Sequence, residues 1–279
     1  MDKSTLKKKL KLFYTQLSIF RKNKRLSKSM NLCFSSSENK IKEIVNTIDL
    51  AKKSIADIGG ADGNFIFGLA EKGKINDKNS LYLIDISKRY LSKAKEIYDR
   101  KFSRKFKFKA ICRDIDDLRI NNTFDIVLLR DVLEHLYFPG NAIENIKNSI
   151  RPGGLFLIAT PNKNRLNELV KSLIPERFKH KLKLKFSTDV SGVLKLEKKS
   201  GIKEHIHEYS LKELRNLLTK HNLKIINEFQ SKIPFIAPSL CDKYSFIFNF
   251  ERMFIAAAEL FGLNHYFGFE HIILSKRIK

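Results

Sequence analysis

Hydrophobic positions along the chain alternate between short apolar runs and stretches with helical spacing. Apolar runs between helical stretches predict βαβ units and a parallel sheet covered on both faces. The runs predict strands at residues 54–59, 80–86, 106–112, 124–129, 155–160, 223–229 and 269–274. The helical spacing predicts helices near residues 63–72, 88–100, 142–150, 210–221 and 240–261.

Two of these helices have start signals in the sequence. Ser87 precedes the second helix and is a typical N-cap residue. Ser210 is followed three positions later by Glu213, which is the spacing of a capping box. Both signals place a helix directly after a loop, as the alternation requires.

The first 30 residues predict a basic amphipathic helix. Its apolar positions recur at steps of three and four, which places them on one helix face; they are Leu6, Leu10, Phe13, Leu17 and Phe20. Lys and Arg dominate the remaining positions, and Asp2 is the one acid. Such a helix lies on an anionic membrane or packs its apolar face on the core. We interpret residues 1–37 as a basic N-terminal extension and residues 38–279 as the main domain.

Two segments interrupt the regular alternation. Residues 162–204 are rich in Lys and lack a long periodic run, which indicates a basic surface insertion. Residues 239–263 are rich in Phe and predict an apolar helical cap. That cap is either a helix packed between the last two strands or an apolar roof over a hydrophobic acceptor.

Length and charge limit the partners. The chain of 279 residues suits one α/β domain with insertions, and its net charge of +24 is compatible with nucleic acid, an anionic membrane or an acidic substrate.

We expect no signal peptide, and the longest apolar stretch is interrupted by Glu251 and Arg252. The scattered Cys33, Cys112 and Cys241 lack metal-ligand spacing. A cytoplasmic protein is expected, with a peripheral position at the inner membrane face as an alternative.

The most informative motif is the run IADIGGADG at residues 55–63, which predicts a strand, a tight turn and a helix start. Glycine lets the backbone approach a ligand closely, and the helix start presents free N–H groups. Gly59, Ala61 and Gly63 recur at every second position, whereas a dinucleotide site requires a third glycine where Asn64 stands. A turn without a ligand is the structural alternative.

Acidic residues follow the next two predicted strands. Asp85 closes the second strand, where an acid can accept hydrogen bonds from ribose hydroxyls or can cap the following helix. The run RDIDD at residues 113–117 follows the third strand. Asp114 is the first acid of this run, and Asp116 and Asp117 are close competitors for the same role.

The fourth strand leads into the run RDVLEHL at residues 130–136. Arg130 and Asp131 stand at the carboxyl end of this strand, where open α/β sheets bind ligands. His135 is either a general base, because imidazole titrates near neutrality, or a structural histidine. The run RPGG at residues 151–154 predicts a turn before the fifth strand.

In this order the segments resemble the class I S-adenosylmethionine-dependent methyltransferases, in particular the small-molecule and lipid-type members. The resemblance covers residues 40–160 well and 205–276 loosely. It implies a Rossmann-like α/β fold with a mostly parallel seven-stranded sheet, helices on both faces and an antiparallel last strand. It also implies S-adenosylmethionine as cofactor, bound by Asp57, Gly59, Gly60, Ala61, Gly63, Asp85, Ile86, Asp114, Ile115 and Arg130.

One position departs from the family pattern, because Ala61 replaces a loop glycine. We expect weakened binding rather than none, provided that φ is negative there. The segment with His205, His207 and Tyr209 places these side chains on one side if it is extended. It lines the acceptor pocket or is structural, and two histidines without a near third ligand do not predict a metal site. The catalytic candidates are His135, Asp131 and His207.

The predicted function is methyl transfer to an O, N or C nucleophile of a small or lipid-linked acceptor. Three alternatives stay open at this point. The net charge allows an RNA methyltransferase, the glycine turn allows an NAD-dependent enzyme, and the fold allows a binding protein without turnover.

Overall fold

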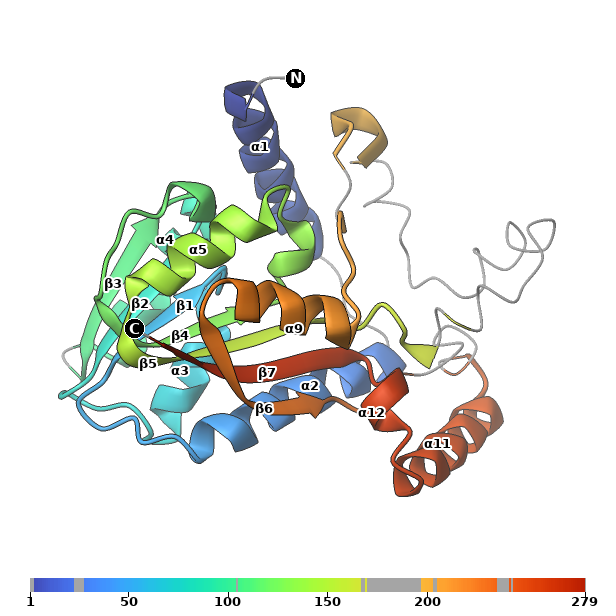
Figure 1. Cartoon of the computed structure of the whole chain (residues 1–279). Helices are drawn as coiled ribbons and strands as arrows, with labels where there is room; N and C mark the ends of the chain where they lie inside the picture. Colours follow the sequence, from blue (N-terminus) through green and yellow to red (C-terminus); the bar gives the residue numbers. More distant parts are fainter. Residues whose placement is uncertain are drawn as a thin grey trace.

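In the computed structural model, a twisted sheet lies between two layers of helices (Figure 1). The structure describes residues 3–22, 28–103, 105–166, 169, 197–202, 205–234, 241 and 243–278. The strands are β1 (Ser54–Ile58), β2 (Ser80–Asp85), β3 (Lys107–Cys112), β4 (Phe124–Arg130), β5 (Ile150–Pro161), β6 (Leu223–Gln230) and β7 (Glu270–Arg277).

The seven strands form one sheet in the order β3-β2-β1-β4-β5-β7-β6. The pairs β1–β2, β1–β4, β2–β3 and β4–β5 are parallel, whereas β7 runs antiparallel to both β5 and β6. This arrangement confirms the predicted Rossmann-like sheet with an antiparallel last strand. The strand order reverses beside β1, so the carboxyl ends of β1 and β4 flank the crevice where such sheets bind ligands.

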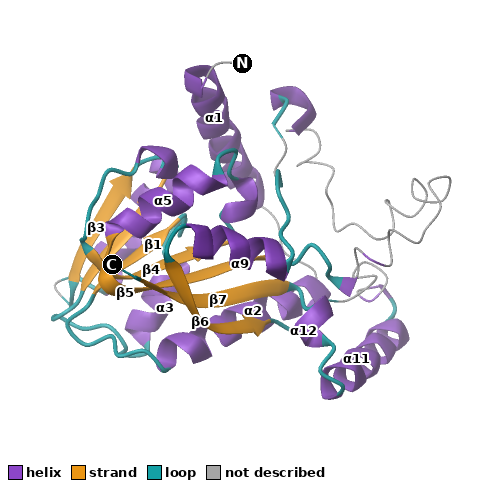
Figure 2. Cartoon of the chain, in the orientation of Figure 1, coloured by secondary structure: helices purple, strands orange, loops and turns teal. Residues whose placement is uncertain are grey.

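Helices cover both faces of the sheet (Figure 2). One face carries α2, α3 and α4, and the other carries α5 and α9, while α1, α11 and α12 lie at the periphery. The helices are α1 (Lys3–Lys22), α2 (Lys28–Asn46), α3 (Asn64–Glu71), α4 (Lys88–Lys101), α5 (Pro139–Ser149), α9 (Leu211–Lys220), α11 (Ser245–Leu260) and α12 (Asn264–Phe267), with short 3-10 turns η1 (Ile115–Asp117) and η2 (Leu133–His135).

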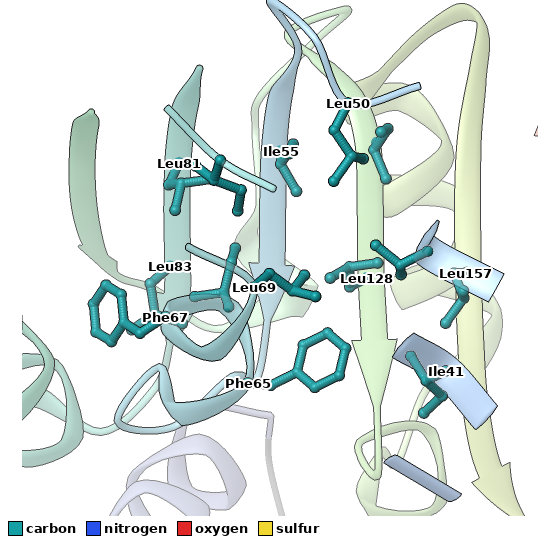
Figure 3. Close-up of a cluster of buried hydrophobic side chains, with 14 of the residues drawn as sticks. Ile41, Leu50, Ile55, Phe65, Phe67, Leu69, Leu81, Leu83, Leu128 and Leu157 are labelled. Atoms are coloured by element: carbon teal, nitrogen blue, oxygen red, sulfur yellow. The ribbon is translucent and has the colours of Figure 1, made fainter. Parts of the chain in front are cut away.

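Each sheet face has its own hydrophobic core, because successive strand residues point to opposite faces. In β4, Ile126 and Leu128 join the core under α2, α3 and α4, whereas Val127 and Leu129 join the core under α5 and α9. Figure 3 shows the first of these cores, where α3 places Phe65 beside the strand side chains. Burial of this apolar surface holds the strand ends, and therefore the site, in place.

The predicted helix starts agree with the structure. The Ser87 side chain accepts a hydrogen bond from the Tyr90 N–H, and Ser210 and Glu213 form both bonds of a capping box. The proposed division between residues 37 and 38 falls inside α2, whose Ser37 side chain donates to Glu270 on β7. The extension and the domain therefore share one continuous helix.

One predicted boundary is wrong. The run at residues 151–154 predicts a turn, but these residues belong to β5, which starts at Ile150. Gly153 has φ +78°, and the pairing of β5 with β4 shifts register between Phe124 and Ile126. A bulge of this kind lets the strand begin earlier than the apolar run suggests.

The predicted basic insertion spans residues 162–204, of which the structure describes 162–166, 169 and 197–202. The rest of the predicted insertion lies outside the described residues. Residues 239–263 include α11, as expected. Among the described helices, none combines the length and the apolar composition that crossing a membrane requires.

Candidate active site

The glycine-rich run forms the tight turn that joins β1 to α3. Gly59 has φ +71°, and its N–H donates to the carbonyl of Ile84 at 2.7 Å. A Cβ atom at Gly59 would overlap the side chain of Val132. Only glycine combines this backbone conformation with this close approach. The turn therefore holds the ends of β1 and β2 beside the segment that follows β4.

The backbone conformation of Ala61 differs from the one expected from the sequence. The prediction required a negative φ at this position, whereas Ala61 has φ +50°. For a residue with a Cβ this left-handed conformation costs roughly 1–2 kcal/mol. The Ala61 N–H donates to Asp85 Oδ2 at 3.1 Å, and this bond helps to hold the unusual conformation. The departure from glycine is therefore accommodated through backbone strain.

Asp85 lies at the end of β2 and accepts two backbone hydrogen bonds. Besides the Ala61 bond, its Oδ1 atom accepts from the Ser87 N–H at 2.7 Å. Burial raises the pKa of Asp85 to about 6, although these hydrogen bonds act in the opposite direction. The carboxyl group is half-buried and faces the same pocket as the glycine turn. It can accept hydrogen bonds from a bound ligand in its ionised form.

Asp57 and Arg130 form a buried pair behind the turn. The Arg130 Nη2 atom lies 3.7 Å from Asp57 Oδ2, and its guanidinium group lies 3.8 Å from the centre of the Phe65 ring. Burial raises the pKa of the Asp57 carboxyl, and the positive charge of Arg130 opposes this rise. Neither carboxylate oxygen of Asp57 has a hydrogen-bond partner among the described residues.

The segment after β3 completes this side of the pocket. The Asp114 side chain caps η1 by accepting from the Asp116 N–H at 3.0 Å. The Asn145 side chain of α5 donates to the carbonyls of Ile115 and Asp116, both at 3.0 Å. Asp114, Ile115 and Asp116 line the pocket, so the structure keeps both acids as candidates for a ligand contact.

A single pocket of about 200 Å³ joins these segments to the residues after β4. Eight predicted site residues line it: Gly59, Ala61, Asp85, Ile86, Asp114, Ile115, Asp131 and His135. Five others are not among its lining residues: Asp57, Gly60, Gly63, Arg130 and His207. Of these, Gly60 packs against Asp57, because a Cβ there would lie 2.6 Å from its carboxyl carbon.

Sequence reasoning missed the wall that α1 contributes to the pocket. Leu6, Leu10 and Tyr14 of α1 line it, and Phe13 is buried against Ile202. The described part of the apolar helix face therefore packs on the protein, which is one of the two alternatives for this segment. The spacing of apolar residues predicts the apolar face of this helix, but it does not predict that the face covers the pocket. Further lining residues without a sequence prediction include Tyr90, Arg113, Leu136, Tyr137 and Phe138.

The segment after β4 carries two acids in different environments. Asp131 is exposed, has φ +52°, and donates its backbone N–H to the Ala159 carbonyl at 3.0 Å. Glu134 is buried and accepts a hydrogen bond from Thr160 Oγ1 at 3.1 Å. Burial raises the pKa of Glu134 well above its usual range, and the nearby Asp131 charge adds to the rise.

His135 lies between α1 and the segment before α9. Its ring centre is 5.8 Å from that of Tyr14 and 5.0 Å from that of His205. The Glu134 carbonyl accepts from the N–H groups of Ile206 at 2.8 Å and His207 at 3.1 Å. The backbone of residues 206–207 is therefore fixed to η2, which brings His205 beside His135.

The same contacts place three possible metal ligands together. One ligand atom each from Glu134, His135 and His205 lies within 4.8 Å of the others. In the sequence, His205 and His207 stand together without a near third ligand. In the fold His205 meets Glu134 and His135 instead, while the His207 ring lies 6.2 Å from that of Tyr209. The absence of a metal stays a prediction.

Comparisons with known proteins agree with this geometry. Residues 49–230 match the family model described as a methyltransferase domain. Ubiquinone biosynthesis O-methyltransferase from Coxiella burnetii is 29% identical over 126 residues, which cover 45% of this chain and 50% of that protein. The chain thus matches about half the length of this curated relative.

Solved structures show the same fold. A SAM-dependent methyltransferase from Aquifex aeolicus is 11% identical, with a TM-score of 0.51 over 85% of this chain and 88% of that one. Phosphoethanolamine N-methyltransferase 2 from Haemonchus contortus, in complex with S-adenosyl-L-methionine, is 14% identical, with a TM-score of 0.54 over 87% of this chain and 52% of that one. The family match favours a methyltransferase domain over an NAD-dependent enzyme. The chain belongs to the methyltransferase domain family, and its sheet is the Rossmann-like sheet expected of class I S-adenosylmethionine-dependent methyltransferases.

Proposed function

We propose that the chain transfers a methyl group to a hydroxyl oxygen of a small or lipid-linked acceptor bound in the pocket between the glycine turn and His135. The observation that supports this most is the continuity of that pocket. It joins a side with Gly59, Ala61, Asp85 and Asp114, here called the donor side, to a side with Tyr14, Asp131, His135 and Tyr137, here called the acceptor side.

The donor side fits a nucleoside-containing methyl donor. The Asp85 carboxylate suits ribose hydroxyls, and the glycine turn lets the backbone approach the ligand without a Cβ at position 59. Asp114 or Asp116 suits an exocyclic amino group, and Ile84 and Ile115 offer apolar contact to a flat ring. When bound, S-adenosylmethionine supplies an electrophilic methyl group on a positively charged sulfur.

The acceptor side supports an apolar acceptor with a hydroxyl group. Leu6, Leu10, Leu136, Tyr137 and Phe138 line the pocket with apolar and aromatic surface. An apolar wall excludes water and holds the acceptor in line with the methyl group, and alignment of this kind supplies much of the rate of such transfers. The curated relative is named as an O-methyltransferase, which agrees with an oxygen nucleophile.

His135 is the proposed general base. With S-adenosylmethionine bound, the acceptor oxygen would form a bond to the methyl carbon as the bond from that carbon to sulfur breaks and S-adenosylhomocysteine leaves. The His135 imidazole ring would take the hydroxyl proton. His135 lines the pocket, and its ring lies beside Tyr14 and His205. Asp131 also lines the pocket and is the second candidate for this role, whereas His207 is a candidate only through its place on the segment bonded to Glu134.

The test is transfer of a labelled methyl group from S-adenosylmethionine to fractions of a cell extract, preceded by calorimetric binding of S-adenosylmethionine and S-adenosylhomocysteine. Label in an organic-solvent fraction at base-stable ether positions supports the proposal. Label in RNA favours the RNA alternative that the charge of +24 allows. Binding of the donor without any labelled product contradicts the proposed acceptor class.

A further inference from the structure

Helix α11 carries apolar side chains on two opposite faces. One face packs inward, where Phe248, Ile255 and Ala258 join a buried cluster with Ile233 and Phe269. The other face points to solvent at helical steps of three and four, which place its members in one stripe. We call this stripe the aromatic face; it consists of Phe246, Phe250, Met253, Phe254, Leu260 and Phe261.

The aromatic face is unusually exposed for such side chains. The exposed fraction is 70% for Phe246, 71% for Phe250, 74% for Met253 and 88% for Leu260. Tyr266 of α12 extends the surface and is also exposed. Single exposed apolar residues are common, but a contiguous patch of this kind marks an interaction surface. In Figure 1, α11 lies outside the two helical layers, where such a surface is accessible.

We propose that the aromatic face docks on an anionic lipid surface. Charge distinguishes this occupant from a second copy of the chain. Two copies would each bring a net charge of +24 to the contact, and this repulsion opposes association, whereas anionic headgroups attract the same charge. Lys243 just before α11 and Arg252 on α11 are exposed and add local positive charge.

The acids of this segment do not oppose such contact. Among the described residues 243–269, the acids are Glu251, which is buried, and Glu259, whose Oε2 atom lies 3.5 Å from Lys232 Nζ. The exposed side of α11 therefore presents aromatic and basic groups without an exposed acid. Tyr244 and Tyr266 flank the stripe, and tyrosine favours the boundary between headgroups and acyl chains.

The geometry suits a helix that lies in the membrane surface. α11 has 16 residues and is therefore about 24 Å long, and none of the described helices is long and apolar enough to span a bilayer. The Asn162 side chain donates to the carbonyls of Tyr266 and Gly268, both at 3.0 Å, and Asn162 also pairs with Tyr209. These bonds tie the segment after α11 to the carboxyl end of β5.

The test is cosedimentation of the full chain with vesicles of phosphatidylcholine alone or mixed with phosphatidylglycerol. We expect binding to the mixed vesicles that weakens at high salt. The triple variant Phe246→Gln, Phe250→Gln, Met253→Gln should lower the partition coefficient at least tenfold without a change in charge. The matched control Asn249→Gln, Ala256→Gln changes exposed positions of the same helix outside the stripe and should bind like the unmodified chain.

Three outcomes would overturn the proposal: no binding of the unmodified chain to anionic vesicles, equal binding of the triple variant, or a dimer that the triple variant dissociates. Equal binding would mean that charge elsewhere on the surface suffices. Circular dichroism melting shows whether the triple variant folds. Parallel calorimetry with S-adenosylmethionine reports on the donor side, so failure of docking and failure of the proposed methyl transfer are distinguishable.

Discussion

The donor side of the pocket is carried by the ends of three neighbouring parallel strands. The acceptor side is assembled from α1 and the residues around η2, and the segment before α9 lies beside them. On the donor side, Asp85 is the last residue of β2, Gly59 directly follows β1 and Asp114 lies two residues after β3, so the sheet alone brings them together. Beside the acceptor side, His135 contacts both Tyr14 and His205, which are 191 positions apart in the chain. Donor recognition is therefore built into the fold, while acceptor recognition depends on segments that can differ between members of one family.

The strongest separation of the two sides is expected from His135→Gln. Loss of a general base lowers methyl transfer by about 100- to 10,000-fold, while binding of S-adenosylmethionine should change by less than about twofold. Calorimetry and labelled-methyl turnover measure the two effects. The control is His221→Gln, which changes a histidine paired with Glu144 at 2.9 Å and away from the pocket. A parallel loss of donor binding would assign His135 to the donor side, and loss of turnover on addition of EDTA would point to a metal.

The next effect concerns Gly59→Ala on the donor side. The left-handed backbone costs roughly 1–2 kcal/mol with a Cβ, and overlap with Val132 adds roughly 1–3 kcal/mol. Urea unfolding should show the sum as lost stability. Gly73→Ala is the matched control, because Gly73 has φ +70° with open space around its Cβ position and should show only the backbone cost. Equal losses would mean that the close approach to Val132 contributes nothing.

Asp85→Asn tests the electrostatics of the donor side. Hydrogen bonds to a charged group contribute about 1.5–3 kcal/mol, so the affinity for S-adenosylmethionine should fall roughly 10- to 100-fold. Because the pKa of Asp85 is raised to about 6, protonation below that pH removes the acceptor, and the affinity of the unmodified chain should fall as pH drops through 6. Calorimetry at several pH values checks this, with Asp99→Asn, from an exposed pair with Lys95, as control. A pH dependence that persists in Asp85→Asn would exclude this carboxyl as its source.

The smallest effect is expected from Ala61→Gly. Relief of the left-handed strain gains roughly 1–2 kcal/mol, and the greater freedom of glycine in the unfolded chain offsets about 0.4–1 kcal/mol of it. The free energy of unfolding should therefore rise by roughly 0 to 1.6 kcal/mol in urea unfolding. Lys52→Gly changes a residue with φ 58° far from the pocket and should alter stability alone. If Ala61→Gly also strengthens donor binding, then the strained turn limits the site as well as the fold.

Most of the architecture follows from the sequence. The apolar runs predicted the strands within one residue or so in most cases, because buried parallel strands are apolar on both faces. β7 continues three residues beyond its predicted end, to Arg277, and β5 begins five residues before its predicted start. The first residues of β5 include Pro152, Gly153 and Gly154 and resemble a turn. Their strand pairing depends on the neighbouring β4, and that information is absent from the local sequence.

For the site, too, the sequence predicts some residues, whereas contacts between distant loops appear only in the fold. The predicted strand ends identified Asp85 and Asp114, but not the positive φ of Ala61, whose N–H donates to the Asp85 side chain. The sequence grouped His205 with His207, whereas the backbone bonds of Glu134 pair His205 with His135. Local spacing cannot predict such contacts, since they form only when separate loops meet.

The sequence by itself determined the fold class, the glycine turn and the acids that follow the second and third strands, because each depends on local periodicity and local backbone preference. Only the tertiary structure decided that α1 covers the pocket, that Glu134 is buried beside Asp131, and that α11 turns one apolar face to solvent. Those features result from packing between distant segments. The periodicity of α1 and α11 shows that each helix has an apolar face. Whether that face is buried or exposed depends on which distant segments pack against it.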